Sequence, residues 1–171
     1  MTSPPAPPQK PITRSVTMLV IHCSASPNGA PHTVQDIDRW HHARGFERSL
    51  SWRSKWNPDL AAIGYHYIIY TDGTVHTGRH RDENGAHVQY HNSYTLGICL
   101  IGTDKFTPAQ WSALADLVRD ERHFYRRVNR ITPLVQGHRE FQGVAKECPG
   151  FSVFDWLTGN MVPLADHLLM D

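Results

Sequence analysis

The chain has 171 residues, enough for one domain that buries roughly two-thirds of the surface exposed by the unfolded chain. Its content of 40% hydrophobic and 19% charged residues is typical of a soluble globular protein. Because 17 basic residues stand against 16 acidic ones, no strong electrostatic field favours a nucleic acid, and we expect no nucleic-acid partner.

The first segment, MTSPPAPPQKPITRS, is rich in proline and lacks apolar periodicity. We expect residues 1–14 to form a flexible arm and residues 15–171 to form a single domain. Prolines occupy the place where a secretory signal would have its apolar core, and no later segment has the length of a membrane span. We therefore expect synthesis in the cytoplasm without a signal peptide, and no membrane partner.

The first element that we expect is a buried strand in VTMLVIHCS, a continuous apolar run that ends in turn-forming residues. His22 lies at the exit of this strand. A crossover helix should follow, because apolar residues recur at helical spacing between Thr33, an N-cap residue, and Gly45, a stop signal. Residues 47–63 carry two tryptophans and show no clean period, which favours an inserted loop or short helix bordering a cleft.

The middle of the chain predicts a hairpin, a strand and a long helix. GYHYIIYTDGTVHTGR is typical of a β-hairpin with Asp72-Gly73 at its turn, and YTLGICLIG of another buried strand after a polar loop. In TPAQWSALADLVRDERHFYRR, Thr107 and Gln110 form a capping box, Pro108 takes the first helical position, and an apolar stripe follows.

The last elements are a strand in PLVQG, which leads into His138, and a closing helix in SVFDWL after Cys148. Strands that alternate with helices predict an α/β fold, in which a central mixed β-sheet is flanked by helices. We find no internal repeat, so a single domain remains the simplest interpretation.

Three side chains that can bind a metal lie just beyond expected strands or on the loop that follows: His22, His138 and Cys148. Ligands gather at such strand ends in open α/β sheets. Zinc hydrolases commonly use three protein ligands and leave the fourth position to water, whereas structural zinc needs four ligands, often in close pairs such as CxxC. The chain has no such pair, so the set favours a catalytic zinc.

Each member of the set also has a simpler interpretation. A histidine is more often a hydrogen-bonded structural residue than a ligand, and a lone cysteine is most often a small buried apolar side chain. Cys23 and Cys99 keep that interpretation, since strand side chains alternate and Cys23 should face away from His22. Lys146 alone would be a solvated surface charge, and Tyr65 a core aromatic. The case for a metal depends on the whole set.

Several segments, in chain order, resemble the zinc-dependent N-acetylmuramoyl-L-alanine amidases of type 2, most of all the phage lysozymes of amidase type. They are VIHCSAS, GYHYIIYTDGTVHTGR, HNSYTLGICLIG, FTPAQ and GHREFQGVAKECPGF. The resemblance runs from about Met18 to about Trp156. It implies the fold of these amidases and of peptidoglycan recognition proteins, and hydrolysis of the amide bond between N-acetylmuramic acid and L-alanine in bacterial peptidoglycan.

The resemblance also implies roles for single residues. His22, His138 and Cys148 would hold Zn2+, while Tyr65 and Lys146 would be catalytic. Hydrolysis of an amide passes through a tetrahedral oxyanion, which the ammonium of Lys146 is placed to stabilise. Tyr65 would orient the water or pass a proton to the leaving amine, and the two roles could be shared or reversed.

Three further residues lie near these positions in the sequence. The resemblance places His87 near the substrate groove, and Asn92 could hydrogen-bond the peptide of the substrate. Glu140, next to His138, is a candidate partner that fixes the tautomer of that imidazole.

Three interpretations of the function follow, led by a phage or prophage endolysin that acts as a monomer on periplasmic murein after its release. A cytosolic amidase that recycles muropeptides is the second, although such enzymes usually have an aspartate in place of Cys148. The third is a non-catalytic peptidoglycan-binding or regulatory module. The presence of Tyr65, Lys146 and Cys148 argues against a pure binder.

Overall fold

The computed structural model describes residues 14–144 and 146–170. Apart from Arg14, the predicted arm lies outside these residues. The described strands are β1 (Met18–Cys23), β2 (Tyr67–Ile69), β3 (Val75–Thr77), β4 (Thr95–Leu100) and β5 (Leu134–Gly137). The α-helices are α1 (Val34–Ala43), α2 (Leu50–Arg53), α3 (Pro108–Val128) and α4 (Val153–Thr158), and two short 3-10 helices are η1 (His138–Glu140) and η2 (Ala165–His167).

The strands form one mixed sheet in the order β3-β2-β4-β1-β5, which confirms the predicted α/β architecture. β1 pairs in parallel with β4 and β5, β2 pairs in parallel with β4, and β2 and β3 form the antiparallel hairpin. All six residues of β4 and five of the six in β1 are buried. Such complete burial suits parallel strands covered on both faces and explains their continuous apolar sequences.

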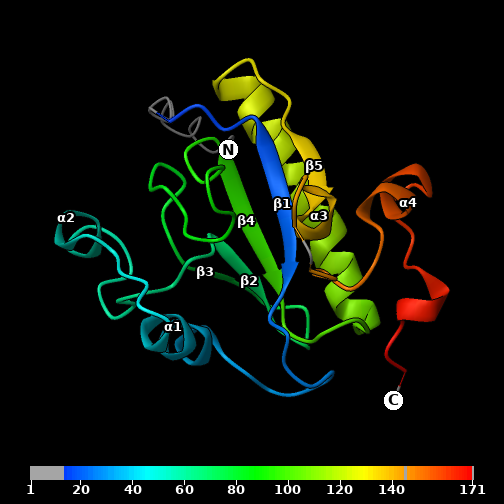
Figure 1. Ribbon diagram of the computed structural model, residues 1–171. Helices are drawn as coiled ribbons and strands as arrows, with labels where there is room; N and C mark the ends of the chain where they lie inside the picture. Colours follow the sequence, from blue (N-terminus) through cyan, green and yellow to red (C-terminus); the bar gives the residue numbers. More distant parts are fainter. Residues whose placement is uncertain (1–13, 145, 171) are drawn as a thin grey trace, which may run out of the picture.

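Helix α3 packs against one face of the sheet, and Figure 1 shows it running behind β1 and β5. It begins as predicted, because the side chains of Thr107 and Gln110 form both halves of the capping box. Trp111 and Leu114 of this helix belong to the same buried cluster as Leu19 of β1. This cluster is the main core and holds the central strands in place.

The opposite face of the sheet is covered by α1 and by loops. Ile37 of α1 lies in one apolar cluster on this side, while Val20 of β1 packs with Val88 and Phe141 in another. Because strand side chains alternate, His22 shares the face of Val20. The loop after β3 and the segment around η1 therefore surround the position where His22 lies.

Arg14 ties the start of the described chain to the loop that precedes β4. Its guanidinium donates to the backbone oxygens of Arg81 at 2.7 and 3.0 Å, of Asn92 at 3.0 Å and of Thr95 at 2.8 Å. Residue 14 is thus hydrogen-bonded into the domain. The boundary between an arm over residues 1–14 and the domain otherwise stays a prediction.

The remaining elements agree with the sequence in type. The hairpin turns at Asp72 and Gly73, where Gly73 adopts a positive φ of 84°. Residues 47–63, predicted as a loop or short helix, contain α2, and α4 is the predicted closing helix. The short helices η1 and η2 have no counterpart among the predicted elements. In the part of the chain that the structure describes, no helix combines the length and apolar character needed to cross a membrane.

Candidate metal centre

Strand register brings two histidines to the same edge of the sheet. Ile21 of β1 and Gly137 of β5 are paired residues, and His22 and His138 are the residues that directly follow them. Since the two strands run parallel, both imidazoles emerge together beyond the last shared pair. Parallel pairing therefore makes neighbours of two residues that are far apart in the sequence.

Cys148 joins the two histidines from the loop after η1. Its backbone oxygen accepts from Arg139 N at 2.7 Å, which folds the loop back onto η1. Its sulfur accepts from the backbone N–H of Cys23 at 3.3 Å and lies 3.6 Å from His22 Nδ1. The thiol is consequently held against the end of β1.

The three side chains form a compact set of donors. Their ligand atoms all lie within 4.8 Å of one another, and the rings of His22 and His138 have centroids 4.7 Å apart. A tetrahedral zinc with ordinary bond lengths would separate a sulfur from a nitrogen by about 3.5 Å, close to the 3.6 Å between Cys148 Sγ and His22 Nδ1. The donor set fits a divalent ion that prefers nitrogen and sulfur and leaves one coordination position open.

Burial keeps both imidazoles in the neutral form that can bind a metal. Desolvation, reinforced by the nearby His138 and Lys146, holds the pKa of His22 well below its usual value. Desolvation and the charge of Lys146 lower the pKa of His138 to about 4. The pKa of the Cys148 thiol shifts in the opposite direction, because contact with the Cys23 side chain and burial both raise it. Binding of a cation would therefore have to displace the thiol proton.

Cys23 is closer to the site than its sequence pattern suggested. Its side chain belongs to the core cluster on the α3 face, as alternation predicts. However, its backbone N–H and its side chain both contact the sulfur of Cys148. Cys23 therefore does more than fill the apolar core, because its backbone N–H donates the hydrogen bond that orients the candidate ligand Cys148.

Tyr65 lies between two histidines beside the candidate centre. Its ring centroid is 5.0 Å from that of His22 and 5.1 Å from that of His41. Burial raises the pKa of the Tyr65 hydroxyl well above its usual value, so the phenol keeps its proton at neutral pH. Gly78 allows this placement, because a Cβ there would lie 2.2 Å from the Tyr65 backbone oxygen.

Lys146 is exposed, two residues before Cys148 in the sequence. Its positive charge contributes to the lowered pKa of both His22 and His138, which places its influence at the centre. The five residues that the sequence selected as ligands or catalytic groups are thus found around one point of the molecule, with Tyr65 half-buried and Lys146 exposed.

His87 contacts the candidate ligand His22 directly. His87 Nδ1 and His22 Nε2 are 2.9 Å apart, and the rings are nearly perpendicular, at 89°. Gly97 leaves room for this ring, since a Cβ there would lie 2.8 Å from His87 Cγ. The other ring nitrogen of His87 lies 3.3 Å from Thr95 Oγ1. His87 therefore bridges His22 and a threonine of β4.

Asn92 and Glu140 have structural partners in the backbone. Asn92 Oδ1 accepts from the backbone N–H of His87 at 2.9 Å and of Val88 at 3.0 Å, and so holds the loop that presents His87. The Glu140 carboxylate was expected to fix the His138 tautomer. Instead, its oxygens accept from Gly137 N and from two N–H groups at the start of α4.

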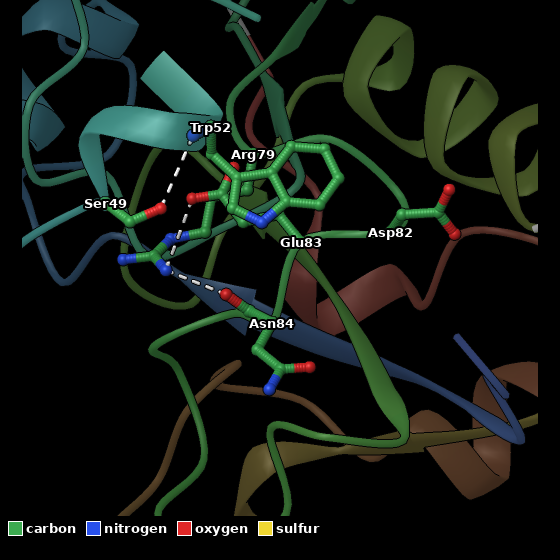
Figure 2. A pocket seen from close by; sticks show the side chains of 6 residues that line it. All are labelled: Ser49, Trp52, Arg79, Asp82, Glu83 and Asn84. Carbon is green, nitrogen blue, oxygen red and sulfur yellow. Dashed lines mark hydrogen bonds and ion pairs between the residues drawn. The ribbon is translucent and has the colours of Figure 1, made fainter. Parts of the chain in front are cut away.

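A cavity of about 300 Å³ lies next to α2, outside the metal centre. Figure 2 shows its six lining residues, which are Ser49, Trp52, Arg79, Asp82, Glu83 and Asn84. Arg79 donates to the backbone oxygen of Asn84 at 2.7 Å and is 3.5 Å from a Glu83 carboxylate oxygen. The predicted cleft beside residues 47–63 is thus a polar depression with one tryptophan, and none of its six lining residues belongs to the donor set.

The sequence of residues 12–151 matches the N-acetylmuramoyl-L-alanine amidase family. The chain belongs to this family of amidases. The endolysin of Klebsiella phage KP32 is 30% identical over 162 residues, which cover 90% of this chain and 93% of the relative.

Solved structures agree with the fold of this amidase. N-acetylmuramoyl-L-alanine amidase LysC from Clostridium intestinale URNW is similar with a TM-score of 0.64 and 28% identity, covering 86% of each chain. Drosophila PGRP-LB shares the fold, with a TM-score of 0.59, 24% identity and coverage of 94% of this chain and 86% of its own. The fold expected from the sequence, that of type 2 amidases and peptidoglycan recognition proteins, is confirmed.

The sequence did not reveal three residues that shape the centre of the amidase. Thr95 contacts His87, Arg14 anchors the loop between them, and Cys23 orients Cys148. All three act through backbone groups or through a second side chain, so no spacing rule identifies them. Nothing in the residue type of Arg14 indicates that its guanidinium bonds the backbone of a loop more than 60 positions away.

Proposed function

We propose that this amidase is a zinc-dependent endolysin that hydrolyses the amide bond between N-acetylmuramic acid and L-alanine of peptidoglycan. The observation that carries the proposal is the convergence of two neutral imidazoles and one thiol within 4.8 Å. Zinc is proposed because nitrogen and sulfur donors in a set of three are typical of its catalytic sites.

Zinc in such a site supplies a Lewis acid that polarises the amide carbonyl and makes water nucleophilic near neutral pH. The protein's contribution is to hold the ligands in the correct form. Burial keeps His22 and His138 unprotonated, and the hydrogen bond from Cys23 N aims the sulfur of Cys148 at the shared point. The ends of β1 and β5 therefore position the two histidines, and the N–H of Cys23 positions Cys148.

The reaction also needs a partner for the negative charge that develops on the carbonyl oxygen. The ammonium of Lys146 is the cationic group at the solvent side of the centre, and we assign it to this oxyanion. The Tyr65 hydroxyl keeps its proton and lies beside His22, so it can donate a hydrogen bond to water or to the leaving amine. Together with the proposed ligands, these two groups would supply the roles that hydrolysis of an amide requires.

The endolysin role is supported by a relative of nearly the same length. The KP32 endolysin is covered over 93% of its length, so the match is not limited to a shared fragment. We propose that the amidase acts on the cell wall after release from the cytoplasm, which lyses the host. Action as a monomer, and the absence of membrane and nucleic-acid partners, stay predictions.

The deciding experiment is mass spectrometry of purified sacculi digested with the zinc-loaded protein. We expect peptides with a new free L-alanine amino terminus and glycan strands that retain N-acetylmuramic acid. Faster hydrolysis of small soluble muropeptides than of intact sacculi would instead favour a recycling enzyme. Binding to sacculi with no new amino terminus would favour a non-catalytic module and overturn the proposed activity.

A further inference from the structure

A continuous series of hydrogen-bonding groups, called the relay below, runs from the candidate ligand His22 through His87 and Thr95 to the backbone oxygen of His91. His22 Nε2 lies 2.9 Å from His87 Nδ1, His87 Nε2 lies 3.3 Å from Thr95 Oγ1, and Thr95 Oγ1 lies 2.9 Å from the carbonyl oxygen of His91. Thr95 is fully buried, so water does not compete for its hydroxyl. The relay ends at the carbonyl oxygen of His91, which can act only as a hydrogen-bond acceptor.

This carbonyl oxygen determines which atom donates the proton in each hydrogen bond of the relay. A carbonyl oxygen only accepts, so the single hydroxyl proton of Thr95 must be donated to His91 O. Thr95 Oγ1 can then only accept from His87, which puts the proton of that ring on Nε2. His87 Nδ1 is left as an acceptor, and it receives the Nε2 proton of His22. Nδ1 of His22 consequently carries no proton, and it faces the sulfur of Cys148 at 3.6 Å.

We propose that His87 and Thr95 are positioning residues that fix the tautomer and ring orientation of the metal ligand His22. The inference rests on the proposed zinc function and changes the role expected for His87, which the sequence placed at the substrate. A ligand imidazole whose second nitrogen donates to a fixed acceptor loses less orientational freedom on binding the metal. We therefore expect the relay to raise the affinity of the protein for the metal.

The surroundings of His87 are built to keep it in this position. Gly85 and Gly97 pack so closely that a Cβ at either would lie within 3 Å of the ring. The His87 backbone N–H is held by Asn92, whose own carbonyl oxygen accepts from Arg14. The ring is thus enclosed on its faces and anchored at its backbone, with both nitrogens directed along the relay.

Long-range proton–nitrogen NMR spectra of 15N-labelled protein test the relay directly. We expect His22 and His87 to be neutral with their protons on Nε2 in the metal-free protein at neutral pH. Their signals are assigned by the loss of one set in His87→Gln. A proton on Nδ1 of His87 would overturn the inference even if the protein binds zinc, whereas failure of the parent protein to bind zinc would overturn the proposed function.

Zinc affinity, measured by competition with a chromophoric chelator, tests the consequence. We expect His87→Ala to weaken zinc binding by about 10–100-fold. His87→Gln should recover most of this loss, because its amide can accept from His22 and donate to Thr95. Thr95→Val, which keeps the shape but removes the hydroxyl, should weaken binding by about 3–10-fold.

Two matched variants separate the relay from general damage to the fold. Thr103→Val removes a threonine hydroxyl that donates to Ser26 O, and His76→Gln alters a half-buried histidine whose ring stacks on Tyr70. Both should leave zinc affinity within about twofold of the parent. If His87→Ala raises KM but leaves zinc affinity unchanged, His87 is a substrate contact and the inference is wrong.

Discussion

Lys146 combines exposure with an effect on two buried imidazoles. Its exposed side chain can reach solvent and bound substrate, and we propose that it stabilises an oxyanion that forms only during the reaction. Its charge already disfavours protonation of His22 and His138. We therefore expect this one exposed cation to act both on the proposed ligands and on the oxyanion.

Replacement of Lys146 by alanine should lower turnover without removing the metal. We expect kcat to fall by about 10²–10³-fold, the usual effect of losing one oxyanion donor, while zinc content stays at the parental level. Turbidity loss of sacculi and metal analysis measure the two quantities. Lys105→Ala, which alters another exposed lysine, is the control. Parental turnover in Lys146→Ala would remove Lys146 from the mechanism.

The two neighbouring thiols, Cys148 and Cys23, should differ sharply when each is changed to alanine. Only the sulfur of Cys148 groups with the two imidazoles, so Cys148→Ala should lose both zinc and lysis. Cys23→Ala keeps the backbone N–H that orients Cys148 and should retain zinc after dialysis. Full clearing of sacculi by Cys148→Ala would contradict the assigned chemistry.

At the scale of single residues, the sequence could identify groups that act alone but not groups that act through others. His22, His138 and Cys148 are recognisable because each follows a strand-like run or lies in a loop marked by glycine and proline. The role of Thr95 depends on a backbone carbonyl at His91, which leaves no trace in residue type. For the same reason the sequence pairs the carboxylate of Glu140 with an imidazole, whereas in the structure it accepts from Gly137 N and from two N–H groups at the start of α4.

At the scale of elements, the loop between β3 and β4 is the least regular segment near the centre, yet it is held by buried polar contacts. Arg14 donates to the backbone oxygens of Arg81 and Asn92 in this loop and of Thr95 at the start of β4. Burial lowers the pKa of this guanidinium without neutralising it. A loop that must present His87 is thus fixed by a residue more than 70 positions away in the sequence.

Arg14→Met should destabilise this loop while keeping the length of the side chain. We expect a loss of about 1–3 kcal/mol in unfolding free energy, because buried carbonyl oxygens would lose their donors. Urea unfolding measures the loss, and amide hydrogen exchange should accelerate between residues 81 and 95. Arg39→Met, on the exposed side of α1, should change stability by less than about 0.5 kcal/mol. Equal effects of the two variants would contradict the anchoring role.

Elements with local signals were predictable, and elements defined by packing were not. Helix α3 was evident from Thr107, Pro108 and Gln110, because a capping box and a first-turn proline are local features. The order of strands, in contrast, depends on which faces meet after collapse. The sequence therefore predicted a mixed sheet but not that β1 would lie between β4 and β5, the arrangement that brings the two histidines together.

At the scale of the whole molecule, two buried histidines should make the metal-free fold sensitive to acid. Burial lowers the pKa of His41 to about 4 and that of His66 to about 3. His41 Nδ1 accepts from Gly64 N at 2.8 Å, and His66 Nδ1 accepts from Gly97 N at 3.0 Å, so both rings are needed neutral. Unfolded histidines, with a pKa of about 6.5, take up protons first.

The free energy of unfolding should consequently fall as the pH decreases from about 6.5 toward about 4. In this window the unfolded state binds more protons, and each histidine contributes a slope of at most about 1.4 kcal/mol per pH unit. Urea unfolding of metal-free protein at several pH values measures the slope. His41→Gln, whose amide can still accept from Gly64 but does not titrate, should show a smaller slope. An identical slope in that variant would contradict the assignment.

Metal removal should affect stability and activity together, because the proposed ligands belong to distant parts of the chain. Zinc at about 100 times its dissociation constant would add about 2.7 kcal/mol, which raises the melting temperature of a domain of this size by roughly 5–10 °C. A chelator should abolish both the increase and the lysis of sacculi, and added zinc should restore them. Cys148→Ala should show no shift, and lysis that persists in excess chelator would contradict a metal mechanism.

The spacing of the donors along the chain has a consequence for biosynthesis. His22 belongs to the first strand in the sequence, whereas His138 and Cys148 follow the last one. The candidate centre therefore combines residues from the beginning and the end of the sheet-forming part of the chain. A ribosome must translate past residue 148 before a complete set of donors exists. On the proposed zinc function, products released earlier would lack one metal ligand, so the producing cell would meet hydrolytic activity only from chains whose entire sheet had been synthesised.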